Sequence, residues 1–246
     1  MLSVMFRVGT SGWQYDDWKG TFYPRGLPAA RWLPYFAERF HTVEVNNTFY
    51  RLPSEDVFRR WRASTPVGFL MAVKASRYIT HVRRLREPRE PVELLWSRCR
   101  SLGDRLGPVL FQLPPGFRRD MGLLRDLLAV LPRGMRAAFE FRDRSWTDDE
   151  VLEALDGAGA AFVLAHTPGA RVPDVVTGGW SYVRFHQGTR GGPDYTAATL
   201  TAWARRLAEL PARDVFVYFN NDTGGAALRD AERLIGRLRR GGMDVA

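Results

Sequence analysis

The fold class is decided by residues 109–142, which read VLFQLPPGFRRDMGLLRDLLAVLPRGMRAAFEFR. Short apolar runs at 109–113 and 137–142 have the length of buried strands, and turn-forming glycine or proline lies near each of them. The segment between them carries leucines at helical spacing, namely Leu124, Leu127, Leu128 and Leu131. A strand, a helix and a second strand in this order indicate parallel pairing through a crossover helix. The stretch therefore predicts an α/β fold.

The same alternation of strand and helix patterns extends in both directions along the chain. Helical spacing of apolar residues recurs over 92–106, 200–210 and 228–238. Eight alternating units in 246 residues match the number and the size typical of one TIM-type (β/α)8 barrel. We therefore expect residues 1–246 to form a single barrel domain. Its eight strands are expected at 6–10, 42–46, 68–74, 109–113, 137–142, 161–166, 181–186 and 214–220.

Two local signals refine this expectation. The segment after the sixth expected strand contains Pro168, Gly169, Pro173 and the pair Gly178-Gly179, which disfavour a regular helix. We therefore expect the sixth helix to be irregular or shortened. Elsewhere, Thr147-Asp148-Asp149-Glu150 has the pattern of a capping box, which predicts that a helix begins there with the Thr147 hydroxyl as its cap.

The composition narrows the class of protein. The chain has no run of about 18 apolar residues and no signal-peptide pattern, so we expect neither a membrane span nor secretion. Cys99 is the only cysteine, which fits a cytoplasmic protein without disulfides. The formal net charge is +9, and because only Lys19 and Lys74 are lysines, 34 of the 36 cationic side chains are arginine. Such a charge attracts anions, but the arginines are spread along the chain, so nucleic acid is an alternative partner that the sequence does not favour.

Polar side chains share one parity of the expected strands near their carboxyl ends. Successive side chains of a strand point to opposite faces, and active sites of TIM barrels lie at the carboxyl ends of the strands. We therefore expect these side chains to form one site. The set consists of Glu44, Asn46, Lys74, Gln112, Glu140, Arg142, His166, Arg184, His186, Tyr218 and Asn220.

Three members of this set are predicted to be catalytic. Glu44, Glu140 and His186 carry the groups that general acid–base catalysis uses. The alternative for both glutamates is a simple ion pair with an arginine or with Lys74.

The remaining members are predicted to bind the substrate. Arg142 and Arg184 can clamp an anionic group, or they pair with the glutamates. Lys74 is predicted to bind the anion, with a Schiff base as its alternative role. The uncharged and histidine members of this group are Asn46, Gln112, His166, Tyr218 and Asn220.

No metal and no cofactor are predicted. His166 or His186 could bind a metal ion with Glu140 or Asp222, but the chain has no HExxH motif and no cysteine cluster, and the nearby cations would repel the ion. The glycine-bearing loops at 188–192 and 221–225 either bind phosphate through backbone N–H groups or form tight turns.

A set of motifs runs in order through nearly the whole chain. Its members are Gly9-Thr10-Ser11-Gly12-Trp13, Glu44-Val45-Asn46 with Phe49-Tyr50, Lys74, Gln112-Leu113-Pro114-Pro115, Glu140-Phe141-Arg142 with Trp146, Tyr182 with Arg184 and His186, and Tyr218-Phe219-Asn220-Asn221. In these motifs the chain resembles the YecE-like proteins, also called domain of unknown function 72. One departure is Gln187, where the family commonly has glycine directly after the histidine. The resemblance implies a (β/α)8 barrel and no particular reaction.

These features together predict a metal-independent enzyme that uses acid–base chemistry on a small anionic substrate, phosphorylated or carboxylated and sugar-like. Hydrolysis, isomerisation and lyase chemistry stay open as the reaction. One alternative is a metal-dependent phosphodiesterase or nuclease that acts on nucleic acid. The other is a non-catalytic binder of an anionic metabolite.

Overall fold

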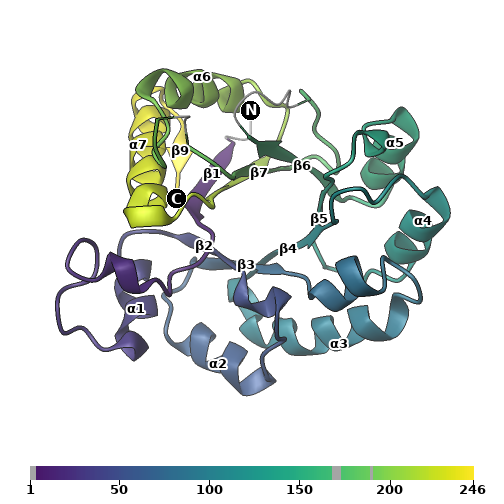
Figure 1. Ribbon diagram of the computed structural model, residues 1–246, viewed down its shortest axis with the longest axis horizontal. Coiled ribbons are helices and arrows are strands. Elements are labelled where there is room, and N and C mark those ends of the chain that lie inside the picture. Colours follow the sequence, from purple (N-terminus) through teal and green to yellow (C-terminus); the bar gives the residue numbers. More distant parts are fainter. Residues whose placement is uncertain (1–3, 168–172, 189–190) are drawn as a thin grey trace.

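The structure is a computed structural model that describes residues 4–167, 173–188 and 191–246, and its centre is one curled parallel sheet (Figure 1). The sheet has nine strands in the order β2-β3-β4-β5-β6-β7-β8-β1-β9. Every pairing between neighbours is parallel. The strands are β1 (Met5–Thr10), β2 (Thr42–Val45), β3 (Leu70–Lys74), β4 (Leu106–Gln112), β5 (Ala137–Glu140), β6 (Ala161–His166), β7 (Ser181–Phe185), β8 (Asp214–Phe219) and β9 (Asp244–Val245). The predicted α/β class is confirmed.

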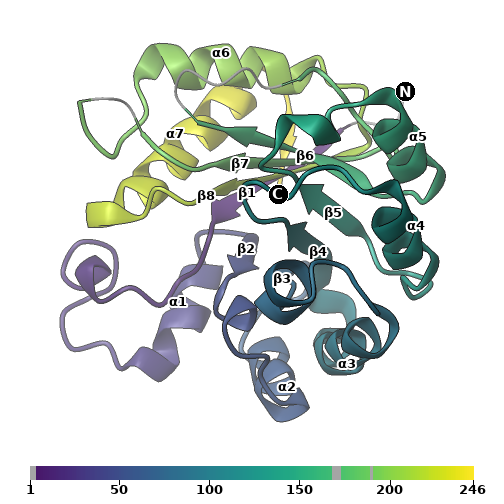
Figure 2. The ribbon, with the colours of Figure 1, turned by 45° about the vertical axis from the view of Figure 1, so that its right-hand side comes forward.

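The α-helices cover the outer side of the curled sheet (Figures 1 and 2). Among the described residues they are α1 (Trp32–Ala37), α2 (Glu55–Ala63), α3 (Arg89–Cys99), α4 (Met121–Ala129), α5 (Asp149–Gly157), α6 (Ala197–Ala208) and α7 (Ala226–Arg240). Their amphipathic spacing decides which face is buried: α6 buries Leu200, Trp203 and Leu207, which lie three and four residues apart. Between β6 and β7, residues 167 and 173–180 contain no helix, in line with the expected irregular sixth unit, and 168–172 lie outside the described residues.

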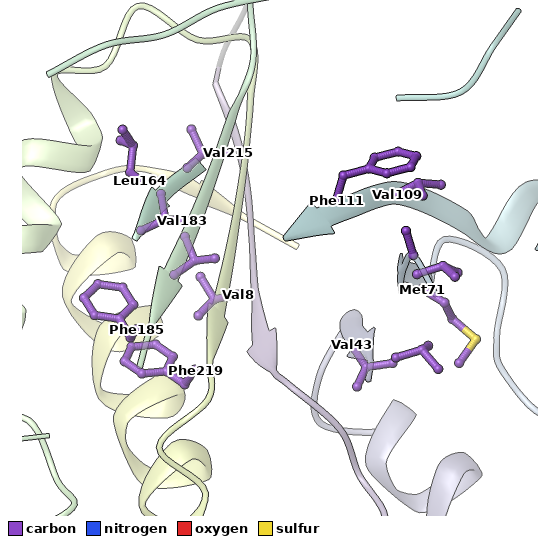
Figure 3. Packing of buried hydrophobic residues seen from close by; sticks show 14 of the residues in the cluster. Val8, Val43, Met71, Val109, Phe111, Leu164, Val183, Phe185, Val215 and Phe219 are labelled. Atoms are coloured by element: carbon purple, nitrogen blue, oxygen red, sulfur yellow. The ribbon is translucent and has the colours of Figure 1, made fainter. Parts of the chain in front are cut away.

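The two faces of the sheet bury different side chains. On the outer face, large apolar residues such as Phe111, Val183 and Phe219 pack toward the helices (Figure 3). On the inner face a smaller cluster includes Leu110, Val163 and Phe216. Because side chains alternate along a strand, the polar residues on the inner parity follow this apolar cluster toward the carboxyl ends.

Several element boundaries differ from the expected ones. The helix expected over 92–106 ends at Cys99, and a 3₁₀ segment, Arg100–Arg105, follows it. Within that segment Gly103 has a φ of 56°, which interrupts the helical backbone. Leu106 already belongs to β4. The two-residue strand β9 was not predicted, since two residues are too few for a period-two pattern.

The predicted cap of α5 was wrong by one residue. The Asp148 carboxylate, not the Thr147 hydroxyl, accepts a hydrogen bond from the Glu150 N–H. Thr147 instead donates to the carbonyl oxygen of Arg144 in the preceding turn. Both residue types can cap a helix, so the sequence pattern alone could not separate the two.

Candidate functional site

Arg184 joins two carboxylates at the centre of the candidate site. Its Nη1, on β7, is 2.6 Å from Glu140 Oε2 on β5, and its Nη2 is 2.7 Å from Glu44 Oε1 on β2. Nη1 also donates to Gln112 Oε1 on β4 at 3.3 Å. The charged side chains of this trio are at most 1 % exposed. For these three residues, the ion-pair alternative is therefore the observed arrangement.

Glu44 receives two further hydrogen bonds. Ser11 Oγ donates to Oε1 at 2.7 Å, and Tyr182 OH donates to Oε2 at 2.6 Å. Burial alone would raise the pKa of Glu44, but the positive charge of Arg184 and these two hydrogen bonds bring it below its ordinary value. Glu44 is therefore ionised at neutral pH and enclosed by its partners.

Glu140 connects this buried centre to the solvent-facing part of the site. Its Oε1 is 2.6 Å from Arg142 Nη2 and 3.0 Å from His186 Nε2. Side-chain exposure rises from 0 % for Glu140 to 8 % for His186 and 27 % for Arg142. Burial would raise the pKa of Glu140, but Arg184, the hydrogen bond with His186 and the charge of Arg142 hold it well below its usual range. The carboxylate is thus charged, and its two outer partners are the groups nearer to solvent.

His186 is subject to opposing influences. Burial lowers the pKa of its imidazole, Glu140 acts in the opposite direction, and Arg184 and Arg142 lower the pKa further. The net result is a lowered pKa, so the ring is neutral near pH 7. Arg142 Nη2, which can only donate, also lies 3.0 Å from Nε2 and 3.5 Å from Nδ1 of this ring. When Nε2–H donates to Glu140, Nδ1 is the acceptor of the neutral ring and faces Arg142.

Lys74 differs from Arg142 and Arg184, the other cations of the candidate site, because it has no carboxylate partner among the described residues. Among the residues that the structure describes, its Nζ forms no ion pair and no hydrogen bond, and it lies 4.3 Å from the centre of the Phe49 ring. Burial and the nearby Arg184 lower the pKa of Lys74 to about 8, although Glu44 and Glu140 oppose this shift. An appreciable share of this amine is therefore uncharged in mildly alkaline solution.

Two asparagines of the predicted set approach each other. Asn46, directly after β2, has its Nδ2 3.4 Å from Asn220 Oδ1 and 3.4 Å from the carbonyl oxygen of Ser11. In the described part of the chain, the buried Asn46 Oδ1 has no hydrogen-bond donor. A buried acceptor without a donor costs free energy, so a ligand that donates to this oxygen would be bound favourably.

His166 does not join this group, contrary to the prediction. It has the parity of Phe162 and Leu164, which pack toward the helices on the outer side of β6. Its Nδ1 is 3.1 Å from Tyr195 OH, and its ring centroid is 5.6 Å from that of Phe185. His166 is therefore part of the packing between the sheet and α6.

Tyr218 points inward as predicted but lies below the reachable part of the site. Its side chain is fully buried, its OH is 2.6 Å from Thr42 Oγ1, and its ring is 5.1 Å from that of Tyr182. Tyr218 thus supports the inner cluster and is not exposed to solvent.

Ser11, Tyr182 and His81 had no role assigned from the sequence, and Phe49 was expected either to stack on a sugar or base or to shape the rim of the site. Ser11, Tyr182 and Phe49 are members of the family motifs, and Tyr182 also has the inward parity of its strand, which was the available signal. No signal pointed to His81, whose ring is 4.9 Å from that of Phe49. Burial and the charge of Lys74 lower the pKa of His81, so it belongs to the same surroundings.

The segment that carries His81 has an unusual backbone. Tyr78–Val82 is a π-helix, and Arg84, Leu85 and Glu87 have φ values of 48°, 65° and 46°. Both features are costly and are frequent at functional sites. Because His81 contacts Phe49, and Phe49 contacts Lys74, this strained segment lies beside the part of the site that contains Lys74.

The glycine-bearing loop at 221–225 is engaged within the protein. The Gly224 N–H donates to Asp17 Oδ2 at 3.0 Å. Burial and the Asp222 carboxylate raise the pKa of Tyr15, which indicates negative charge beside the loop. This surrounding disfavours the phosphate role that the sequence left open. Residues 189–190 of the other glycine loop lie outside the described residues.

Neither a helix able to span a membrane nor a cluster of metal ligands occurs among the described residues. None of the helices described is long and apolar enough to cross a membrane. Across 4–167, 173–188 and 191–246, no three His, Cys, Asp or Glu side chains are grouped so that they could hold a metal ion.

Comparison with known proteins places the chain in a family. Residues 7–245 match the family described as "Protein of unknown function DUF72", so the chain belongs to it, and the resemblance to YecE-like proteins is confirmed. UPF0759 protein YunF of Bacillus subtilis (strain 168) is 27% identical over 94% of this chain and 94% of its own length. UPF0759 protein YecE of Escherichia coli (strain K12) is 30% identical over 139 residues, which are 56% of this chain and 48% of YecE.

A solved structure supports the fold. The crystal structure of a DUF72 family protein (TM1631) from Thermotoga maritima MSB8 is 29% identical and superimposes with a TM-score of 0.86, covering 96% of this chain and 99% of its own. These descriptions name a family and no reaction.

Proposed function

We propose that this protein is a metal-independent enzyme that transfers protons on a small anionic substrate, phosphorylated or carboxylated and sugar-like. The observation that carries the proposal is the charge at the carboxyl ends of the strands. Both buried carboxylates have cationic partners, whereas Lys74 has none among the described residues. A half-buried surplus cation is stabilised when an anion binds beside it.

The anion would be held by Lys74 and Arg142 rather than by Arg184. The Arg184 side chain is 1 % exposed, and its guanidinium already forms ion pairs with Glu44 and Glu140. Arg142 is 27 % exposed, so part of its planar fork can donate to a phosphate or carboxylate.

Proton transfer would fall to His186. Its lowered pKa makes it a neutral base near pH 7, and Glu140 behind it stabilises the imidazolium that forms when it accepts a proton. Glu44 is ionised and enclosed, so in this proposal it holds Arg184 and moves no proton.

We also infer that the curled sheet closes into a (β/α)8 barrel through β1 and β2. Ser11 and Glu44 form an isolated parallel bridge between the ends of these strands. A Cβ on Gly9 would lie 2.2 Å from the carbonyl oxygen of Thr42, so the two backbones approach as closely as glycine permits. The ion pair between Glu44 on β2 and Arg184 on β7, at 2.7 Å, supports this closure.

A thermal-shift screen tests the proposed function. Inorganic phosphate, sugar phosphates and small carboxylates are added to the wild type, to Lys74→Met and to Lys19→Met. Lys19 is the matched control because its side chain is 52 % exposed and its amine pairs with Asp16 at 2.6 Å. A ligand at about 100 times its dissociation constant adds about 2.7 kcal/mol of stability.

The expected result is that some of these anions stabilise the wild type and Lys19→Met, and that Lys74→Met loses most of the effect. Equal stabilisation of all three proteins would show that the anion binds elsewhere. Stabilisation of none would argue against a small-anion site.

A further inference from the structure

Lysine is rare in this chain, yet one of its two lysines lies in the candidate site. The chain has 34 arginines, and the other cationic positions of the site, Arg142 and Arg184, are arginine. A guanidinium is always protonated, so it holds charge but is no nucleophile. The primary amine of Lys74 therefore points to a property that arginine lacks.

The surroundings of Lys74 leave its amine available for bond formation. No described oxygen pairs with Nζ, which lies over the face of Phe49. Burial disfavours the protonated amine, and the positive charge of Arg184 acts in the same direction. A desolvated lysine beside another cation is a typical Schiff-base nucleophile.

We infer that Lys74 forms a Schiff base with an aldehyde or ketone group of the anionic substrate, an inference that rests on the proposed function and names its substrate class. The neutral Nζ attacks the carbonyl carbon, a C–N bond forms, and a proton passes from nitrogen to the oxygen. The resulting hydroxyl takes a further proton and leaves as water while the nitrogen lone pair forms the C=N bond. One amine, one carbonyl group and one proton thus give one iminium ion and one water.

The site also suits the product of this step. The iminium ion carries the same single positive charge as protonated Lys74, so the Phe49 ring and the carboxylates Glu44 and Glu140 stabilise it as well. Arg142 donates to the phosphate or carboxylate of the substrate, and the positive charge kept at Lys74 continues to attract it. Covalent attachment is therefore compatible with anion binding by both side chains.

Imine trapping tests this inference on the intact chain. The protein is incubated with sodium cyanoborohydride and with pyruvate, dihydroxyacetone phosphate or glyceraldehyde 3-phosphate, and tandem mass spectrometry locates the modified residue. The expected product is a stable adduct at Lys74 whose mass increase equals the probe less one oxygen atom. Lys19, with its more exposed side chain, reports nonspecific reaction in the same sample.

Two variants and two analogues separate the outcomes. Lys74→Arg keeps the charge and is expected to lose the adduct, whereas Lys19→Arg keeps it. Lactate and glycerol 3-phosphate cannot form an imine, so their thermal shifts report anion binding alone. Stabilisation by these analogues with no adduct from any probe overturns the Schiff base and leaves the proposed function standing. No stabilisation and no adduct overturn both, and equal labelling of Lys19 and Lys74 overturns the Schiff base.

Discussion

At the residue scale, the electrostatics of the site depend on Arg184. Its guanidinium lies between two carboxylates that are fully buried, and the three side chains come from β7, β2 and β5. A buried charge without a partner costs several kcal/mol even after the structure relaxes. Removing this one cation therefore leaves Glu44 without an ion-pair partner and leaves Glu140 with Arg142 as its remaining cationic partner.

Replacing Arg184 by methionine is expected to destabilise the protein by about 3–5 kcal/mol, the range for breaking a buried ion pair. Urea denaturation measures the free energy of unfolding. Arg205→Met, at an exposed position of α6, is the control and should change it by less than about 0.5 kcal/mol. Adding Glu44→Gln and Glu140→Gln to Arg184→Met should recover part of the loss. A cost no larger than the control's would contradict the buried trio.

Lys74 is expected to lower stability near neutral pH. Its pKa falls from the ordinary 10.5 to about 8 in the folded chain, so between these values the unfolded chain binds more protons and stability rises with pH. Below pH 8 the amine is protonated in both the folded and the unfolded chain, so the full free-energy cost of burying its charge is present. Lys74→Met should therefore be more stable than the wild type by on the order of 1–3 kcal/mol at pH 7 and should lose most of that advantage by pH 10.5. Urea denaturation at both pH values checks this, and an unchanging difference would count against it.

At the element scale, strand positions were predictable from the sequence, but the facing of one strand was not. In β7 and directly after it, Arg184 and His186 alternate with apolar residues, so the inward face was evident. In β6, both parities of 161–165 are apolar, and His166 was assigned to the wrong face for that reason. Parity predicts which face of a sheet a side chain lies on, but it does not predict which residue that side chain contacts. Glu44 and Arg184 are 140 positions apart, and only the fold brings them together.

The contact between β1 and β2 is expected to be sensitive to a single methyl group. Gly9→Ala would place a Cβ against the Thr42 carbonyl, where neither backbone can yield cheaply, and should cost about 1–3 kcal/mol. Gly157→Ala, at the end of α5 with open space around it, should be neutral or stabilising by up to about 1 kcal/mol. Thermal unfolding of both variants measures the difference, and equal effects would argue against close approach of the two strands.

The corrected cap of α5 has its own test. Asp148→Ala removes the side chain that accepts the Glu150 N–H and should cost about 1 kcal/mol. Thr147→Ala removes only a bond to the preceding turn and should cost less. Urea denaturation ranks the two variants, and the opposite ranking would restore Thr147 as the cap.

At the scale of the whole molecule, one face of the curled sheet forms the core with the helices and the other face carries the candidate site. Its outer face is apolar and packs toward the helices, whereas the inner face becomes polar toward the carboxyl ends of the strands. Chain length and alternating patterns predicted the α/β class, and the motifs predicted the family. They could not show that Lys74 lacks a carboxylate partner. That follows from the pairing of Arg184 with both Glu44 and Glu140, which depends on the folded arrangement of three strands.

Competitive acetylation of the two lysines tests the central claim most directly. The protein is treated with a trace of acetic anhydride, with and without the anions that stabilise it, and mass spectrometry gives the rate at Lys74 relative to Lys19 in the same sample. If Lys74 is the surplus cation that receives the substrate, a bound anion slows its acetylation and leaves Lys19 unaffected. Equal rates at Lys74 with and without every anion would contradict the account.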